Sequence, residues 1–269
     1  ECYRFEHRGP HTLREQVLGA GLKAVQISAL RESSAWDSGG GGHGWINRRQ
    51  EFEKVWSLNV RGSKVVVIAT AYETRPVLVE SMLAQTFHNW ELYLVHDGPA
   101  PNGFSLYDDT RVHFREAPGP RKHYGLPIRE EYLEKVKAGK IEGAYVVVTN
   151  HDNYHAPFFL EKLVKALDDN PDAPGAYCSA MVHNYAGFPG QVPAPGKQNV
   201  EDGYNIIQVK PERGYMDCAC AMIRAPLAGA VGWPDYSHSS DWTYLNSIAQ
   251  KNGGWARFKV VPGVLLVHN

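Results

Sequence analysis

The sequence predicts an α/β fold in which helices flank a mixed, mostly parallel β-sheet. Residues 64–99 contain an apolar β-branched run, a polar turn, an amphipathic helical pattern and a second apolar run that ends at Asp97. This order describes a β-α-β unit. The first run, VVVIAT, is apolar throughout, as in strands that are buried on both faces of a parallel sheet.

Segments of strand and helix pattern continue to residue 269. The predicted strands cover residues 65–70, 91–98, 111–114, 144–149, 176–185 and 216–224, and a closing strand pair covers residues 256–269. The predicted helices cover residues 74–87, 124–137, 158–170 and 241–253, and residues 188–202, rich in Gly and Pro, predict a long surface loop.

Residues 1–63 have a different pattern, and we place a domain boundary after them. The segment HTLREQVLGAGLKAVQI predicts a helix, a glycine stop and a short strand, and it resembles the end of a class I methyltransferase domain. The other interpretation is a helical N-terminal appendage that packs on the main domain. Because the chain begins at Glu1 rather than at Met, we expect it to be part of a longer protein.

Composition excludes several classes of protein. The 28 Lys and Arg residues balance 29 Asp and Glu residues, so no nucleic-acid-binding surface is predicted. No apolar run approaches the roughly 20 residues that span a bilayer, and no transmembrane segment or signal peptide is expected. The four cysteines lack metal-ligand or disulfide spacing, which favours a reducing, cytoplasmic location. Cys218 and Cys220 alternate along a predicted strand and are expected on opposite faces.

The end of each predicted parallel strand carries polar residues. We expect Thr70, Tyr72 and Asp97 just past the strand ends. Ligands of open α/β sheets bind at the edge formed by the carboxyl ends of the strands. These residues therefore predict a binding site at that edge.

Five motifs in residues 64–269 resemble those of family-2 glycosyltransferases with the GT-A fold. They are IATAYETRP, SMLAQTFHNWELYLVHDG, VVVTNHDNYHAP, VGWPDYSHSSDW and the final VHN. The resemblance implies a nucleotide-binding, Rossmann-like mixed sheet. It also implies transfer of a sugar from a nucleoside-diphosphate sugar (UDP-, GDP- or dTDP-linked) to a hydroxyl of a carbohydrate or other acceptor, as in polysaccharide or glycan biosynthesis.

The resemblance assigns the nucleoside end of the donor to Thr70, Tyr72 and Asp97. An aromatic ring can stack on the base, and a carboxylate can accept a hydrogen bond from its ring N–H. The alternative for Tyr72 is a tyrosine at the rim of the core. For Asp97, which precedes a glycine, it is a turn that ends the strand.

The metal motif of the family, usually Asp-x-Asp, falls on the sequence NHDN at residues 150–153, where Asp152 is the one carboxylate. The resemblance implies Asp152 and His268 as ligands of Mn²⁺ or Mg²⁺, and one protein carboxylate with phosphate oxygens meets the minimum for such a cation. The alternative for His268 is a polar residue at the end of an apolar strand. His151 and His155 are expected to be structural or rim residues.

The acceptor side is expected around SHSSDWTYL. By resemblance, Asp241 is the general base of an inverting, direct displacement. The structural alternative is a cap at the start of a helix. Trp233 and Trp242 would flank Asp241, where flat aromatic faces suit the apolar faces of a sugar ring, although tryptophan is more often buried in a core.

Arg129 aligns with an arginine that approaches the donor in the family, so it is expected to bind the diphosphate or to pair with a neighbouring Glu. Arg121 and Lys122 are alternative phosphate partners. Two other functions stay open: a nucleotidyltransferase on a similar sheet, and a catalytically inactive GT-A domain that binds carbohydrate or acts as a scaffold. A nucleotidyltransferase would need a glycine-rich basic loop after the first strand, and ATAYETRP has no glycine.

Overall fold

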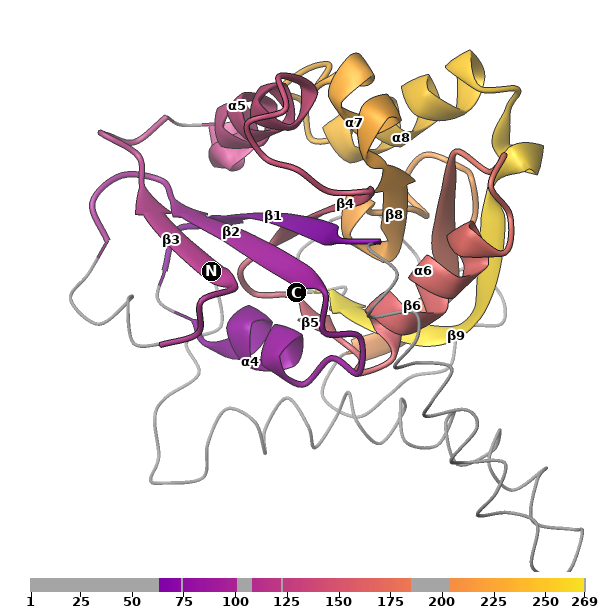
Figure 1. The fold of residues 1–269 in the computed structure, drawn as a ribbon, viewed down its shortest axis with the longest axis horizontal. Helices are drawn as coiled ribbons and strands as arrows, with labels where there is room; N and C mark the ends of the chain where they lie inside the picture. The colour runs from indigo at the N-terminus through magenta and orange to yellow at the C-terminus, as the bar shows by residue number, and fades with distance from the viewer. Residues whose placement is uncertain (1–62, 74, 101–107, 122, 185–203, 269) are drawn as a thin grey trace, which may run out of the picture.

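The structure is a computed structural model that describes residues 63–73, 75–100, 108–121, 123–184 and 204–268. Residues 1–62 of the predicted N-terminal appendage and the whole predicted loop at residues 188–202 lie outside the described residues. Within them, a single mixed sheet of nine strands forms the centre of the molecule (Figure 1). The predicted α/β class is therefore confirmed.

The sheet has the strand order β3-β2-β1-β4-β8-β6-β9-β5, with β7 paired to β6. The strands are β1 (Val65–Ala71), β2 (Trp90–His96), β3 (Val112–Glu116), β4 (Tyr145–Asn150), β5 (Tyr154–His155), β6 (Gly175–Asn184), β7 (Tyr204–Gln208), β8 (Ala221–Arg224) and β9 (Lys259–His268). The first four in this order pair in parallel, whereas β8 is antiparallel to both of its neighbours.

The strands β3, β2, β1 and β4 form the parallel half of the sheet, and β1 lies inside it, between β2 and β4. All seven of its residues are buried, as its unbroken apolar pattern predicted. Thr70 lies within this strand, paired with Val95 and Asn150, and the strand ends at Ala71. The expectation that Thr70 follows the strand end is therefore wrong. The strand runs on because β2 pairs with it through Ala71 and β4 pairs with it through Thr70.

Helices cover both faces of the sheet (Figure 1). On one face lie α5 (Leu126–Lys137), α7 (Ala225–Val231) and α8 (Ser240–Lys251), which pack in sequence against one another. The other face carries α4 (Val77–Leu83) and α6 (Phe159–Asp168). The Thr86 hydroxyl, which follows α4, hydrogen-bonds the Pro157 carbonyl and the Glu161 carboxylate at the start of α6. No helix of the described residues is both long and apolar enough to cross a membrane.

The predicted strand at residues 216–224 is only partly correct. Residues Cys218–Cys220 form a 3₁₀ turn, η5, and only Ala221–Arg224 continue as β8. The Asp217 carboxylate caps this turn by accepting from the Ala219 N–H at 2.7 Å, which favours the turn over an extended chain. Cys218 and Cys220 are therefore not on opposite faces of a strand, and both are buried as free thiols with Cys178.

Other boundaries differ from the sequence prediction in smaller ways. The predicted closing strand pair is one strand, β9, which is parallel to β6 with irregular register near Ala180. The short β5 and β7 and the helix α7 were not predicted, since none is long enough to show a period. The predicted helix at residues 124–137 begins two residues later, because Tyr124 has φ 55° and Gly125 has φ 70°.

Candidate functional site

Thr70 and Asn150 lie side by side where β1 and β4 end. The fully buried Thr70 hydroxyl donates to Asn150 Oδ1 at 3.3 Å. The two residues are also partners in the strand register. The structure thus joins a residue of the predicted nucleoside site to the first residue of the NHDN turn.

Tyr72 follows β1 directly and is 41% exposed. Burial of part of the ring, and then the negative charge of Asp97, raise the pKa of its hydroxyl well above the usual range. Asp152 contributes in the same direction. Tyr72 therefore remains a neutral, half-buried aromatic residue close to Asp97 and Asp152. Its ring lies edge-on to the His151 ring, with centroids 6.2 Å apart.

Asp97 follows β2 and holds a neighbouring loop at the same edge. Its backbone N–H donates to the Ala71 carbonyl at 2.8 Å, and its Oδ1 accepts from the Arg121 N–H at 2.6 Å. Gly98 has φ 99°, a conformation that favours glycine. The turn predicted as the structural alternative is present, and it leaves the carboxylate beside Tyr72.

Asn150 of the NHDN sequence ends β4, and the other three residues form the turn between β4 and β5. Asn153 donates to the Thr149 hydroxyl at 3.1 Å, which closes the turn. His151 is 5% exposed, and burial lowers its pKa. The Asp152 charge acts on Tyr72, on His151 and on His268. Asp152 is thus close to the nucleoside edge and to the end of β9.

Arg129 of α5 is 3% exposed, and its guanidinium joins separate parts of the site. It donates to Asp241 Oδ1 at 2.8 Å and to Asn150 Oδ1 at 2.5 Å. It also lies over the Trp233 ring, with Cζ 4.8 Å from the ring centroid. The expectation that Arg129 pairs with a neighbouring Glu is wrong, because the helix buries this side chain and the buried guanidinium takes Asp241 as its partner.

Asp241 is the second residue of α8, and Ser239 occupies the cap position without a side-chain cap bond. The carboxylate is therefore in the first turn and does not cap the helix as the structural alternative supposed. Burial, together with the charge of Asp217, raises the pKa of Asp241 to about 6, against the opposing effect of Arg129. The side chain keeps 25% of its surface exposed, so a partner in solution can reach it.

Asp217 and His268 form a second buried pair. His268 Nε2 lies 3.1 Å from Asp217 Oδ2, and the His268 ring stacks on His183 with centroids 4.4 Å apart. Burial would raise the pKa of Asp217, but His268, the Ala219 N–H and Arg129 hold it well below its usual range. Burial lowers the pKa of His268, and Asp217, Asp152 and Asp241 together raise it above its usual value.

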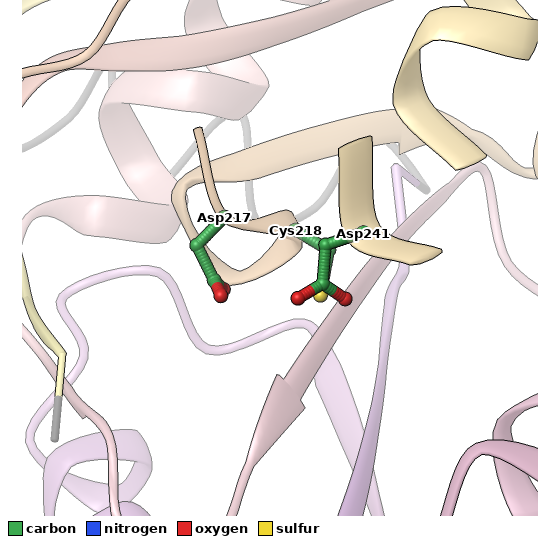
Figure 2. A group of neighbouring side chains, drawn as sticks. All are labelled: Asp217, Cys218 and Asp241. Carbon is green, nitrogen blue, oxygen red and sulfur yellow. The ribbon is translucent and has the colours of Figure 1, made fainter. Parts of the chain in front are cut away.

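The two pairs meet at Cys218, whose sulfur is seen behind the Asp241 carboxylate in Figure 2, with Asp217 beside them. The carboxylates point the same way, and one ligand atom from each of the three side chains lies within 4.8 Å of the others. Burial and the Asp241 charge raise the pKa of the Cys218 thiol well above its usual range. This group could hold a metal ion, although the sequence predicted neither Asp217 nor Cys218 as a site residue. The one sequence signal for Asp217 is its residue type, because Asp is a common cap at the start of a helical turn.

The other expected residues lie around this centre. Trp233 is 5% exposed and stacks on Tyr244, with ring centroids 5.0 Å apart. Trp242 stacks on Trp255, with ring centroids 5.6 Å apart. His155 is buried and bonds the Ala219 carbonyl through Nε2 at 3.2 Å, which matches its expected structural role. Arg121 Nη1 forms an ion pair with Glu131 Oε2 at 2.6 Å. Lys122 lies outside the described residues.

Comparison with known proteins gives similarity in part of the chain. No family model matches. The uncharacterized protein y4gI of Sinorhizobium fredii (strain NBRC 101917 / NGR234) is 30% identical over 149 residues, which cover 48% of this chain and 15% of that protein. The chain thus spans a small part of the length of this relative.

Solved structures show the fold. The crystal structure of S. aureus TarS residues 1–349 has a TM-score of 0.55 and 13% identity over 77% of this chain and 60% of that one. The complex of the same TarS fragment with UDP-GlcNAc has a TM-score of 0.54 and 13% identity over 77% and 58% of the two chains. The fold is that of these GT-A-type glycosyltransferases, as the sequence resemblance implied. Assignment to family 2 and the methyltransferase resemblance stay predictions.

Proposed function

We propose that residues 64–269 form a domain that transfers a sugar from a nucleoside-diphosphate sugar to an acceptor hydroxyl with inversion, and that Asp241 is the general base. The observation that carries this proposal is the state of Asp241. It is a partly exposed carboxyl with a pKa near 6, held by a buried arginine on a fold shared with glycosyltransferases. A general base works best when its pKa is near the working pH.

Contacts between side chains connect this base to the donor end. Asp241 accepts from Arg129, Arg129 donates to Asn150 Oδ1, and the same oxygen accepts from Thr70. Because Asn150 is neutral, the Arg129 charge is balanced by Asp241 rather than by the NHDN turn. The contacts therefore hold the base at a set position relative to Thr70, Tyr72 and Asp97, which we assign to the nucleoside.

The reaction itself would follow from this arrangement. Asp241 accepts the acceptor proton while the acceptor oxygen forms a bond to the anomeric carbon. The bond from that carbon to the donor diphosphate breaks, and the nucleoside diphosphate leaves with the electron pair. Attack from the face opposite the leaving group inverts the configuration of the anomeric carbon. Asp241 is ionised above about pH 6, so it can take this proton at neutral pH.

Asp152 and His268 would hold a divalent cation, Mn²⁺ or Mg²⁺. The residues suit such an ion because His268 Nδ1 is buried without a hydrogen-bond partner among the described residues and the Asp152 charge acts on the same imidazole. A carboxylate with an imidazole favours Mn²⁺ at least as much as Mg²⁺. When bound, the cation would offset the negative charge of the donor diphosphate.

The test begins with a donor. UDP-, GDP- and dTDP-sugars are screened for thermal stabilisation of the protein with Mn²⁺ present, because a bound donor stabilises the native state. Turnover of the selected donor is then compared between the wild type and Asp241→Asn. We expect a loss of about 10²- to 10⁴-fold, the usual contribution of a general base.

The matched control is Asp235→Asn, because the Asp235 carboxylate closes a turn with Ser237 and its other interactions are with Thr243 and Arg213. It should turn over donor like the wild type. Equal turnover in Asp241→Asn would remove this residue from the mechanism, and absence of binding by every nucleotide sugar would overturn the proposed reaction.

The second candidate is an inactive GT-A domain that binds carbohydrate. It is favoured by the NHDN turn, in which one carboxylate stands where the family usually has two. It predicts carbohydrate binding by the wild type without donor turnover at any metal concentration. Donor turnover that depends on Asp241 would exclude it.

A further inference from the structure

We propose that Asp217 is a positioning residue for the divalent cation, because its carboxylate fixes His268 so that Nδ1 of the imidazole is available as a metal ligand. This inference rests on the proposed function, which uses a cation between Asp152 and His268. It assigns a role to Asp217, and it places the cation outside the Asp217–Cys218–Asp241 group.

The Asp217 carboxylate is held on both of its oxygens. Oδ1 accepts from the Ala219 N–H at 2.7 Å as the cap of η5, and Oδ2 lies 3.1 Å from His268 Nε2. Rotation of the carboxylate would break the cap as well as the contact with the imidazole. The 3₁₀ turn therefore sets the direction in which Oδ2 points.

The imidazole is correspondingly fixed. His268 is 8% exposed, and its ring is stacked on His183 with an interplanar angle of 16°. A carboxylate can only accept, so Nε2 carries a proton, and in the neutral imidazole the lone pair then lies on Nδ1. That atom is buried and has no hydrogen-bond partner in the part of the chain that the structure describes.

Buried polar atoms normally have a partner, and an exception needs an explanation. A metal ion would supply one, because histidine ligands usually donate their other ring N–H to a carboxylate. The Asp217–His268 pair has this arrangement, with the carboxylate on one nitrogen and the other nitrogen unused.

The Asp217–Cys218–Asp241 group is the competing location, and its ligand atoms are already engaged. Arg129 Nη1 donates to Asp241 Oδ1 at 2.8 Å and lies 3.6 Å from Cys218 Sγ. A cation at this group would have to displace a buried guanidinium or lie beside its positive charge. By contrast, His268 Nδ1 has no hydrogen-bond donor among the described residues that a cation would have to displace.

The experiment measures binding of Mn²⁺ alone, without any nucleotide sugar, by electron paramagnetic resonance of the free ion. In Asp217→Asn the amide oxygen can still cap η5, since Asn caps as well as Asp. The amide NH₂ then faces His268 Nε2, which must become the acceptor, and the imidazole proton moves to Nδ1. We expect Mn²⁺ affinity to fall roughly 10- to 100-fold.

A second measurement does not depend on the variant. Nitrogen-15 NMR of the metal-free wild type at a pH where His268 is neutral should show Nε2 protonated and Nδ1 unprotonated, and Mn²⁺ should broaden the His268 signals first. A wild-type imidazole protonated on Nδ1 rather than Nε2 would overturn the inference.

Two control variants locate the ion. Asp235→Asn makes the same chemical change at a carboxylate outside the site and should bind Mn²⁺ like the wild type. Cys218→Ser should also leave affinity unchanged. Weaker binding in Cys218→Ser with normal binding in Asp217→Asn would place the ion in the Asp217–Cys218–Asp241 group and overturn the inference. If Asp217→Asn binds Mn²⁺ normally while Asp241→Asn loses turnover, this inference fails and the proposed function stands.

Discussion

The two halves of the sheet contribute to the site through different interactions. In the parallel half, backbone hydrogen bonds hold the site residues at the ends of neighbouring strands, as where Asp97 N–H donates to Ala71 and Asp97 Oδ1 accepts from Arg121 N–H. In the other half, charged side chains from separate elements hold one another: Asp241 of α8 with Arg129 of α5, and Asp217 at the start of η5 with His268 of β9.

The two kinds of interaction should respond differently to substitution of a side chain. Residues placed by strand ends keep their positions when one side chain changes, because the backbone holds them. Buried charges depend on their partners, since removal of one leaves the other uncompensated. Arg129 connects the halves, because it comes from α5 and reaches both Asn150 and Asp241. Changes in the charged half should therefore have larger and more coupled effects.

The largest expected effect comes from Arg129→Met. It removes the partner of Asp241 and leaves a mostly buried carboxylate without compensation, so we expect the free energy of unfolding to fall by about 3 kcal/mol. Urea unfolding measures this change. Lys137→Ala is the control, because its pair with Glu134 is exposed and should contribute at most about 0.5 kcal/mol. Equal losses in the two variants would contradict the contrast between buried and exposed charges.

A backbone change tests the parallel half. Gly125 has φ 70°, and a Cβ there would lie 2.8 Å from Thr70 Cβ and from the Tyr72 hydroxyl. Gly125→Ala should lower stability by about 1–2 kcal/mol from the left-handed conformation alone, and it should also weaken donor binding. Gly139→Ala is matched, since φ is 67° and no atom lies within 4 Å of the new Cβ. It should lower stability similarly but leave donor affinity unchanged.

Tyr72→Ala should act on donor affinity alone. Stacking of an aromatic side chain on a nucleic-acid base contributes about 1–3 kcal/mol, so we expect the dissociation constant of the donor to rise about 5- to 150-fold. Calorimetric titration with the donor measures it. The pH dependence of turnover should not move, because Tyr72 remains neutral at all working pH values. A shifted pH profile would show that the two halves are coupled through this residue.

The smallest effect is the pH dependence of the wild type. The pKa of Asp241 is raised from 3.8 to about 6, and only the ionised base accepts a proton. Turnover should therefore fall as pH decreases through about 6, where it is about half of its plateau. Loss of activity only near pH 4 would mean that the base has an ordinary carboxyl pKa.

Local patterns were sufficient for much of the fold. The apolar run of β1, the helix that follows it and the second run predicted the β-α-β unit, because strand and helix periods are properties of consecutive residues. The same patterns placed Tyr72 and Asp97 directly after strands. They failed at Cys218–Cys220, where alternation suggested a strand and a capped 3₁₀ turn formed instead.

The sequence by itself determined the α/β class, the order of its strongly periodic elements, and the resemblance that singled out Asp152, Asp241 and His268. Only the tertiary structure decided which charges meet. Arg129 and Asp241 are 112 positions apart, and Asp217 and His268 lie on different elements. No local pattern encodes such pairs, because burial and the packing of α5, α8, η5 and β9 set the distances on which charge interactions depend.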